Sequence, residues 1–489
     1  MNTQFNFRLV VRVIGALLLV ESIILLLVSL VPIFYNEGDA FYFIVSAIIS
    51  FIIGIILFGL GHHHADKIGK REGSIIVTFT WIFFSLIGLL PYWLSNSIPS
   101  FTNAFFETIS GFTTTGASIL NNIEELSHGM LFWRSLTHWI GGIGIIVISL
   151  AIMPVFSTSG TQLFAAETSG PTKDKIHPKI HGTAKRLVLI YVILTFLETI
   201  LLRFGGMGWF DAICHSFATI ATGGFSTKQS SIAYWDSAYI QYIIILFMIL
   251  SGINFSLYYF GFKRRFDKIL KNEELRYFLL VLISFTLIIT FSLFTFSTDT
   301  TWQVIEQAFR DALFTVSSLM TTTGFGTADY VLWAPFTWII LLIVMLTGAS
   351  AGSTSGGIKM IRIVITIKAC FYEFKRILHP QAIVPVRYNN LLVSESILNK
   401  VLGFLFLYLI VALTGSLILA ATGMNFEESI GGMVSCLGGV GPGLGSVGPY
   451  GNYAAISDSS KWILSVAMLA GRLELFTFFL IFTPTFWKK

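Results

Sequence analysis

The sequence predicts an all-α membrane protein with many spans, and three features support this fold class. Apolar residues make up 54% of the 489 residues. Charged residues make up only 12%, whereas a soluble domain has about 25%. The mean hydropathy is +0.78. The apolar segments are apolar all round rather than alternating, which excludes a membrane β-barrel. Three cysteines, Cys214, Cys370 and Cys436, are too few for a disulfide framework or a four-ligand metal site.

Ten apolar runs are long enough to cross a bilayer, which takes about 20 residues of helix. They lie at 8–34, 41–61, 73–95, 133–156, 186–204, 237–262, 275–297, 336–358, 397–422 and 461–486. The first run is too long for a signal peptide, and no small-residue cleavage site follows it. We therefore expect ten membrane-spanning segments.

The basic residues indicate how these spans are oriented. Of the 31 Lys and Arg residues, 25 lie at the start of span one, after spans two, four, six and eight, or at the end of the chain. Such a bias marks the cytoplasmic side of a membrane protein. We expect a multi-pass protein of the cytoplasmic (inner) membrane with both termini in the cytoplasm.

The outer loops after spans three, five, seven and nine share one pattern. Each begins with an apolar stretch too short to span and ends in a glycine-rich string. The strings are Thr114-Thr115-Gly116-Ala117-Ser118, Ala221-Thr222-Gly223-Gly224-Phe225-Ser226, Thr322-Thr323-Gly324-Phe325-Gly326 and Gly439-Val440-Gly441-Pro442-Gly443. Aligned on Gly116, Gly223, Gly324 and Gly441, they predict four units of helix, half-helix, string and helix with four-fold pseudo-symmetry about the membrane normal.

These repeats predict how the chain is divided. Residues 1–72 hold two additional N-terminal helices, and the four pore units occupy 73–160, 161–270, 271–395 and 396–489. The third unit contains an intramembrane gating loop, for the reasons given below.

Non-helical backbone at membrane depth is tolerated only where protein buries it or where it lines a watery cavity. Four strings meeting on one axis would form a ring of carbonyl oxygens that replaces the hydration shell of a cation, as in a potassium filter. The half-helices would direct their negative C-terminal ends at the ion. Four flexible surface turns are the alternative. The residues expected to bind potassium are Thr114, Thr115, Gly116, Ala221, Thr222, Gly223, Thr322, Thr323, Gly324, Gly439, Val440 and Gly441.

Span eight contains ten consecutive small residues at 348–357, which form a poor helix. Span ten contains Arg472, which lies roughly 17 Å deep at 1.5 Å per residue and needs a cavity or a partner there. We expect the run to form a loop that blocks the pore, and Arg472 to hold that loop and repel cations. The expected gate residues are Gly348, Gly352, Ser353, Thr354, Ser355, Gly356, Gly357 and Arg472.

Each gate feature has an alternative interpretation. The run of small residues is also typical of closely packed membrane helices. Arg472 could instead form an internal ion pair, with Glu474 or Glu198 as its partner.

The motifs resemble those of the TrkH/KtrB superfamily of potassium transporters. The four strings and the segments 133–142, 254–256, 379–380 and 471–474 carry the resemblance, which covers about 73–486. The two additional N-terminal spans resemble the TrkH branch. The resemblance implies one pore per chain, a homodimer and a cytoplasmic TrkA-type regulatory subunit that binds nucleotide. It also implies filter glycines at Gly116, Gly223, Gly324 and Gly441, and the same gate.

Potassium uptake is therefore the function that the sequence predicts. No Walker loop or dinucleotide motif is present, so we expect no cofactor on this chain, only potassium ions in the filter, and no nucleic acid among its partners. The alternative is a membrane-embedded serine hydrolase with Ser350 as nucleophile. Its base would have to lie upstream, because no histidine follows His379. Neither this enzyme nor a receptor-like membrane protein explains four glycine strings.

Overall fold

The computed structural model describes residues 5–61, 69–156, 179–295, 301–382 and 384–487. Of residues 70, 145–156 and 179–184 it describes the backbone alone. Within these ranges the regular structure is helical except for one hairpin, β1 (Arg387–Tyr388) and β2 (Leu391–Leu392), in which Arg387 pairs with Leu392. The predicted all-α fold class is confirmed.

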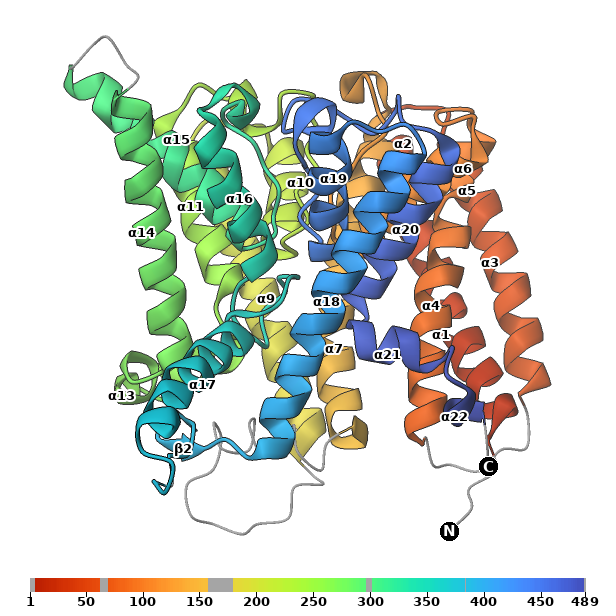
Figure 1. Ribbon diagram of the computed structural model, residues 1–489. Coiled ribbons are helices and arrows are strands. Elements are labelled where there is room, and N and C mark those ends of the chain that lie inside the picture. The colour runs from red at the N-terminus through yellow and green to blue at the C-terminus, as the bar shows by residue number, and fades with distance from the viewer. Residues whose placement is uncertain (1–4, 62–68, 157–178, 296–300, 383, 488–489) are drawn as a thin grey trace.

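Long helices lie side by side and run between the two ends of the molecule (Figure 1). They are α1 (Phe7–Val28) with its continuation α2 (Leu30–Phe34), α3 (Ala40–Leu60), α4 (Lys70–Gly88) with α5 (Leu90–Leu94), α7 (His128–Phe156), α9 (Lys179–Phe204), α14 (Glu273–Thr295) and α18 (Glu395–Ala421). In the described residues, six helices are long and apolar enough to cross a membrane, or seven if one bent pair counts as a span. The chain is a multi-pass membrane protein.

Four further helices, of 12 to 19 residues, lie between these spans. They are α6 (Phe101–Phe112), α10 (Trp209–Ile220), α15 (Trp302–Met320) and α19 (Phe426–Gly438). A glycine string follows each of them, then a single 3-10 turn, namely η1 (Ile123–Glu125), η2 (Ser231–Tyr234), η3 (Tyr330–Leu332) or η4 (Gly445–Val447). The next helix in each case is α7, α11 (Ala238–Gly252), α16 (Pro335–Thr347) or α20 (Asp458–Arg472). The same order of elements thus recurs four times along the chain.

Besides the one-residue breaks between α1 and α2 and between α4 and α5, three of the ten predicted spans are interrupted. Span six consists of α11 and α12 (Phe255–Phe262), bent by 96° with respect to each other. Span eight ends with α16 at Thr347 and resumes as α17 (Met360–Leu378), so the expected break is present. Span ten stops at Arg472 and continues as α21 (Leu475–Leu480) and α22 (Pro484–Trp487). The breaks within 237–262 and 461–486 were not predicted from the sequence.

Local chemistry explains two of these breaks. The Asn254 side chain accepts a hydrogen bond from the Ser256 N–H and caps the start of α12, which favours a new helix at that point. Glu474 has φ 60°, a left-handed conformation that ends the helical path after Arg472.

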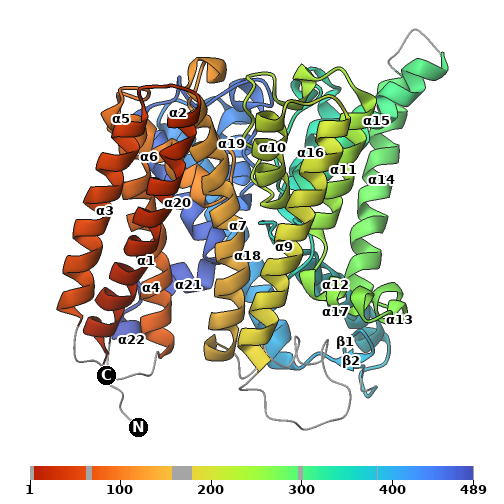
Figure 2. The ribbon, with the colours of Figure 1, turned by 180° about the vertical axis from the view of Figure 1, so that it is seen from behind.

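The two ends of the described chain meet at one end of the molecule. The rings of Phe5 and Trp487 contact each other with centroids 5.9 Å apart, and α1 begins beside α22 (Figures 1 and 2). The short α13 (Phe266–Leu270) lies at the same end. Two of the basic loops used to orient the spans, 62–68 and 157–178, lie outside the described residues. The assignment of this end to the cytoplasm stays a prediction.

Candidate functional site

The four glycine strings follow the same backbone path. In each string, a residue just after the end of the half-helix has a positive, left-handed φ. The glycine two positions later also has a positive φ. The first set is Thr114, Thr222, Thr322 and Gly439, with φ from 53° to 72°. The second set is Gly116, Gly224, Gly324 and Gly441, with φ from 81° to 102°. Four equivalent conformations therefore follow four equivalent half-helices.

The residue between these two positions is held in the same way in every string. Its N–H donates to the carbonyl oxygen five residues earlier, at distances of 2.8 to 2.9 Å. These donor and acceptor pairs are Thr115 and Ser110, Gly223 and Ala218, Thr323 and Ser318, and Val440 and Ser435. Each string is thereby fixed to the end of its own half-helix.

This geometry changes the alignment of the second string. Gly224, and not Gly223, occupies the place of Gly116, Gly324 and Gly441. The alignment on Gly223 was wrong by one residue, because two adjacent glycines fit the sequence pattern equally well. Gly223 instead corresponds to Thr115, and Ala221 corresponds to Thr113.

The strings contact one another in a closed cycle. A Cβ atom on the left-handed glycine of each string would overlap a carbonyl oxygen of the next string. The pairs are Gly116 with Gly223, Gly224 with Thr323, Gly324 with Val440, and Gly441 with Thr115. Glycine is required here for two reasons, namely its positive φ and the close approach of the neighbouring backbone. The carbonyl oxygens of Thr115, Gly223, Thr323 and Val440 thus lie in four corresponding places around one centre.

Side-chain support of this cycle alternates between strings. The Thr113 and Thr115 hydroxyl oxygens are 2.8 Å apart, and those of Thr321 and Thr323 are also 2.8 Å apart. Strings two and four have no hydroxyl at the corresponding positions. Because strings one and three are not neighbours in the cycle, the support has two-fold rather than four-fold symmetry.

A buried ion pair lies behind the first two strings. Arg134 Nε is 2.7 Å from Glu107 Oε1, and its Nη1 donates to the Ser226 carbonyl oxygen at 2.7 Å. The Ile119 N–H donates to the same carboxylate at 2.9 Å. Glu107 is therefore a buried partner of Arg134 that joins string one to string two. Sequence reasoning missed this pair, because 27 positions separate its members.

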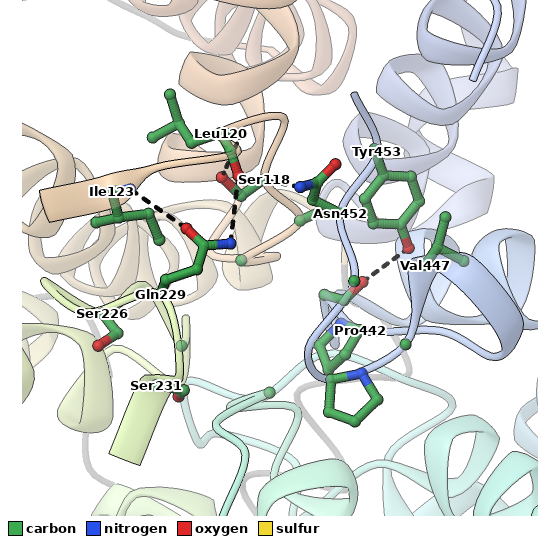
Figure 3. A pocket seen from close by; sticks show the side chains of 18 of the residues that line it. Ser118, Leu120, Ile123, Ser226, Gln229, Ser231, Pro442, Val447, Asn452 and Tyr453 are labelled. Carbon is green, nitrogen blue, oxygen red and sulfur yellow. Dashed lines mark hydrogen bonds between the residues drawn. The ribbon is translucent and has the colours of Figure 1, made fainter. Parts of the chain in front are cut away.

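A pocket opens on one side of the cycle, and the four left-handed glycines lie among its lining residues. Figure 3 shows its walls, in which Gln229 donates to the Leu120 carbonyl and accepts from the Ile123 N–H. The Tyr453 hydroxyl donates to the Gly441 carbonyl at 2.8 Å, so that oxygen is already engaged by the protein. The strings therefore form part of the wall of this pocket.

On the other side of the strings lies the segment 348–359, which is not helical. The Thr354 hydroxyl donates to the carbonyl of Ile220, the last residue of α10, at 3.1 Å. The Gly356 N–H donates to the Thr322 hydroxyl of string three at 2.7 Å. A Cβ atom on Gly356 would overlap the Gly438 carbonyl at the end of α19. The loop thus contacts units two, three and four directly below the strings.

Two further elements hold this loop. The Ser350 N–H donates to the Gly252 carbonyl at 3.0 Å, and the Phe255 N–H donates to the Gly352 carbonyl at 3.1 Å. The break in span six and the break in span eight are therefore hydrogen-bonded to each other. Glu274 Oε1, at the start of α14, accepts from the N–H groups of Ala351 at 2.6 Å and Ile361 at 3.2 Å.

Arg472 lies at the last position of α20 and is buried. Its Nη1 donates to the Thr354 carbonyl at 3.0 Å, and its Nη2 donates to the Gly141 carbonyl of α7 at 2.9 Å. In the part of the chain that the structure describes, no carboxylate lies within 4 Å of its nitrogens, and Glu474 pairs with Arg362 instead. The alternative of an ion pair to Glu474 or Glu198 was therefore wrong.

The remaining alternatives also fail. The small residues at 348–357 do not form a packed helix. Ser350 is buried, and its hydroxyl has no hydrogen-bond partner among the described residues, so no base is in place to activate it.

Comparison with known proteins agrees with this architecture. The family model described as "TrkH: Cation transport protein" matches residues 40–489. The Trk system potassium uptake proteins TrkH of Salmonella typhimurium and of Escherichia coli K12 are each 39% identical over 488 residues, which is 99% of this chain and 100% of theirs. The crystal structure of the potassium transporter TrkH from Vibrio parahaemolyticus aligns with TM-score 0.90 and 34% identity, covering 99% of this chain and 100% of that one.

Proposed function

The chain belongs to the TrkH family of cation transport proteins, and we propose that it takes up potassium through a pore on the centre of the four glycine strings. The two relatives from Salmonella typhimurium and Escherichia coli are named as potassium uptake proteins rather than enzymes. The closed cycle of contacts between the strings is the observation that carries the proposal, because it arranges four backbone carbonyls around one centre.

Potassium would lose its water to these carbonyl oxygens. One set of four carbonyl oxygens comes from Thr115, Gly223, Thr323 and Val440, which contact the neighbouring strings. The residues before and after them add further oxygens, from Thr114, Thr222, Thr322 and Gly439 and from Gly116, Gly224 and Gly324. The Gly441 carbonyl is not counted among them, because it accepts from the Tyr453 hydroxyl. A filter of this kind conducts because each oxygen set binds the ion well enough to admit it and weakly enough to release it. The half-helices add the negative ends of their dipoles.

The loop 348–359 and Arg472 form the proposed gate. The loop lies directly below the strings, where an ion leaving them must pass. The guanidinium fixes the loop at Thr354, and its positive charge repels cations at the same depth. Conduction requires the loop to move, which breaks the hydrogen bonds to Thr354 and Gly141.

Control of this movement would come from outside the chain. We propose a homodimer that binds a cytoplasmic TrkA-type subunit, with both termini on the cytoplasmic side and nucleotide bound by the partner. The membrane potential can drive accumulation, since it supplies about 2.3 kcal/mol per elementary charge for each 100 mV.

Flux into proteoliposomes tests the proposal. Purified wild-type protein should pass potassium in preference to sodium. Gly324→Ala should abolish that flux, because its Cβ would overlap the Val440 carbonyl at a left-handed position. Gly59→Ala is the matched control, since nothing lies within 4 Å of a Cβ at that position. If Gly324→Ala conducts like Gly59→Ala, the strings do not form the pore.

A further inference from the structure

We infer that His138 takes the place of a filter side chain in the second string and thereby sets the selectivity of the pore. The inference rests on the proposed function, because it assigns a role within the same ring of carbonyl oxygens. His138 lies in α7, which belongs to the first unit, whereas the string that it supports belongs to the second.

The starting observation is an unexplained glycine. Thr115, Thr323 and Val440 carry side chains at the central position of their strings, whereas the second string has Gly223. Gly223 is not among the glycines with positive φ, so its backbone conformation does not require glycine. Something other than the main chain must exclude a side chain at this position.

The imidazole of His138 occupies that space. A Cβ atom on Gly223 would overlap three ring atoms of His138, namely Nδ1, Cγ and Cε1. His138 is fully buried. Its ring packs edge-on against Phe225 with centroids 4.1 Å apart, and the guanidinium of Arg134 lies 3.7 Å from the centre of the same Phe225 ring. The imidazole therefore cannot move aside for a side chain at residue 223.

The ring is held there by shape rather than by hydrogen bonds. In the described part of the chain, neither nitrogen of His138 has a hydrogen-bond partner. A buried polar group without partners is costly, and what the ring supplies at this site is its bulk. The hydroxyl pairs that support strings one and three have no counterpart in string two, where Ala221 and Gly223 stand instead.

This packing determines how firmly the Gly223 carbonyl is held. Loss of the imidazole would leave a cavity directly behind string two, and surrounding atoms relax into such a space only in part. The Gly223 oxygen, which contacts the glycine of string one, would then have freedom to shift. A softer ring discriminates less between potassium and the smaller sodium ion, because selectivity depends on the number and placement of the oxygens.

The test removes the imidazole at residue 138 and adds a side chain at residue 223, first separately and then together. His138→Ala should raise the sodium-to-potassium permeability ratio in proteoliposomes by about tenfold, which corresponds to about 1.4 kcal/mol of lost discrimination. Gly223→Thr alone should lose flux or folded yield, because the threonine overlaps the imidazole. The double variant His138→Ala with Gly223→Thr should recover both the yield and the selectivity, since strings one and three carry threonine at this position.

A second buried histidine provides the matched control. His215 lies in α10 of the same unit and has partners for both nitrogens, the Asp211 carbonyl and the Ser226 hydroxyl. His215→Ala should not rescue Gly223→Thr. If rescue only required a less tightly packed protein, both His138→Ala and His215→Ala would rescue Gly223→Thr. The inference requires that only His138→Ala does so.

Each outcome either supports or overturns the role of His138. The inference is overturned if Gly223→Thr alone is as selective as wild type, if folded His138→Ala keeps wild-type selectivity, or if the double variant is no better than Gly223→Thr. If His138→Ala does not fold, recovery of folded yield in the double variant supports the inference and its absence overturns it. Failure of the proposed function is separate, because wild-type protein itself would then not prefer potassium.

Discussion

Arg472 donates a hydrogen bond to the Thr354 carbonyl across 118 positions of sequence, and with its other terminal nitrogen it reaches Gly141. The guanidinium thus connects the loop below the strings to α7 of the first unit. It is a positive charge buried at membrane depth without a carboxylate partner among the described residues. Such a charge is costly, and in membrane proteins it is usually retained for function.

Removing this charge should open the pore. Arg472→Ala is expected to raise potassium flux in the absence of any regulatory subunit by about tenfold. This factor corresponds to about 1.4 kcal/mol less stabilisation of the closed loop relative to the open one. Flux into proteoliposomes measures the change. Arg203→Ala is the control, since Arg203 lies over Trp209 near the start of α10 and away from the loop. Unchanged flux in Arg472→Ala would contradict the gate.

Glu274 should act on the same gate from the opposite side of the loop. Glu274→Ala leaves the half-buried N–H groups of Ala351 and Ile361 without this acceptor, which costs less for each than the roughly 1–3 kcal/mol of a fully buried donor. We expect higher basal flux, with Glu274→Gln closer to wild type because its amide oxygen still accepts. Glu273→Ala, which removes only the ion pair to Lys368, serves as the comparison. Equal flux in the two alanine variants would argue against a role for Glu274.

The buried pair of Glu107 and Arg134 should matter for stability more than for the gate. Breaking one member of a buried pair costs about 3–5 kcal/mol, because the other charge is left without a partner. Glu107→Gln and Arg134→Met should each lower the midpoint of thermal unfolding in detergent. The double variant should be less destabilised than the sum of the two single variants. Strict additivity would contradict the coupling between these side chains.

The paired hydroxyls of strings one and three offer a milder test of the filter. Thr113→Val removes the hydrogen bond to Thr115 while keeping the side-chain shape, and Thr321→Val does the same for Thr323. A hydrogen bond of this kind contributes about 0.5–1.5 kcal/mol. We expect a several-fold loss of selectivity for potassium over sodium in either variant, measured from reversal potentials. Thr366→Val in α17, whose hydroxyl donates to the Arg362 carbonyl at 2.8 Å, should behave like wild type.

Local sequence patterns predicted the strings, the loop and the need of Arg472 for a partner, because each rests on features within one segment. Small residues cannot sustain a helix at 348–357, and an arginine deep in span ten needs a partner. Features that depend on distant segments could not be predicted. The register of string two is decided by its contacts with Thr323 and Gly116, and two adjacent glycines do not distinguish the alternatives.

The breaks in spans six and ten were missed for a related reason. A hydropathy window reports apolar content and not helical continuity, and both segments are apolar throughout. Asn254 is a typical helix N-cap residue, so it carried a local signal for the break in span six. The hydrogen bond between the Ser350 N–H and the Gly252 carbonyl joins that break to the loop. No local sequence pattern indicates this hydrogen bond.

Direct observation of the ion tests the central claim, that the four strings bind the transported cation. Crystals of the full chain grown in thallium or rubidium salts would give an anomalous signal. We predict a peak enclosed by the carbonyl oxygens of Thr115, Gly223, Thr323 and Val440. Protein that transports the same ion but shows its anomalous peaks elsewhere, with none among these oxygens, would contradict the account.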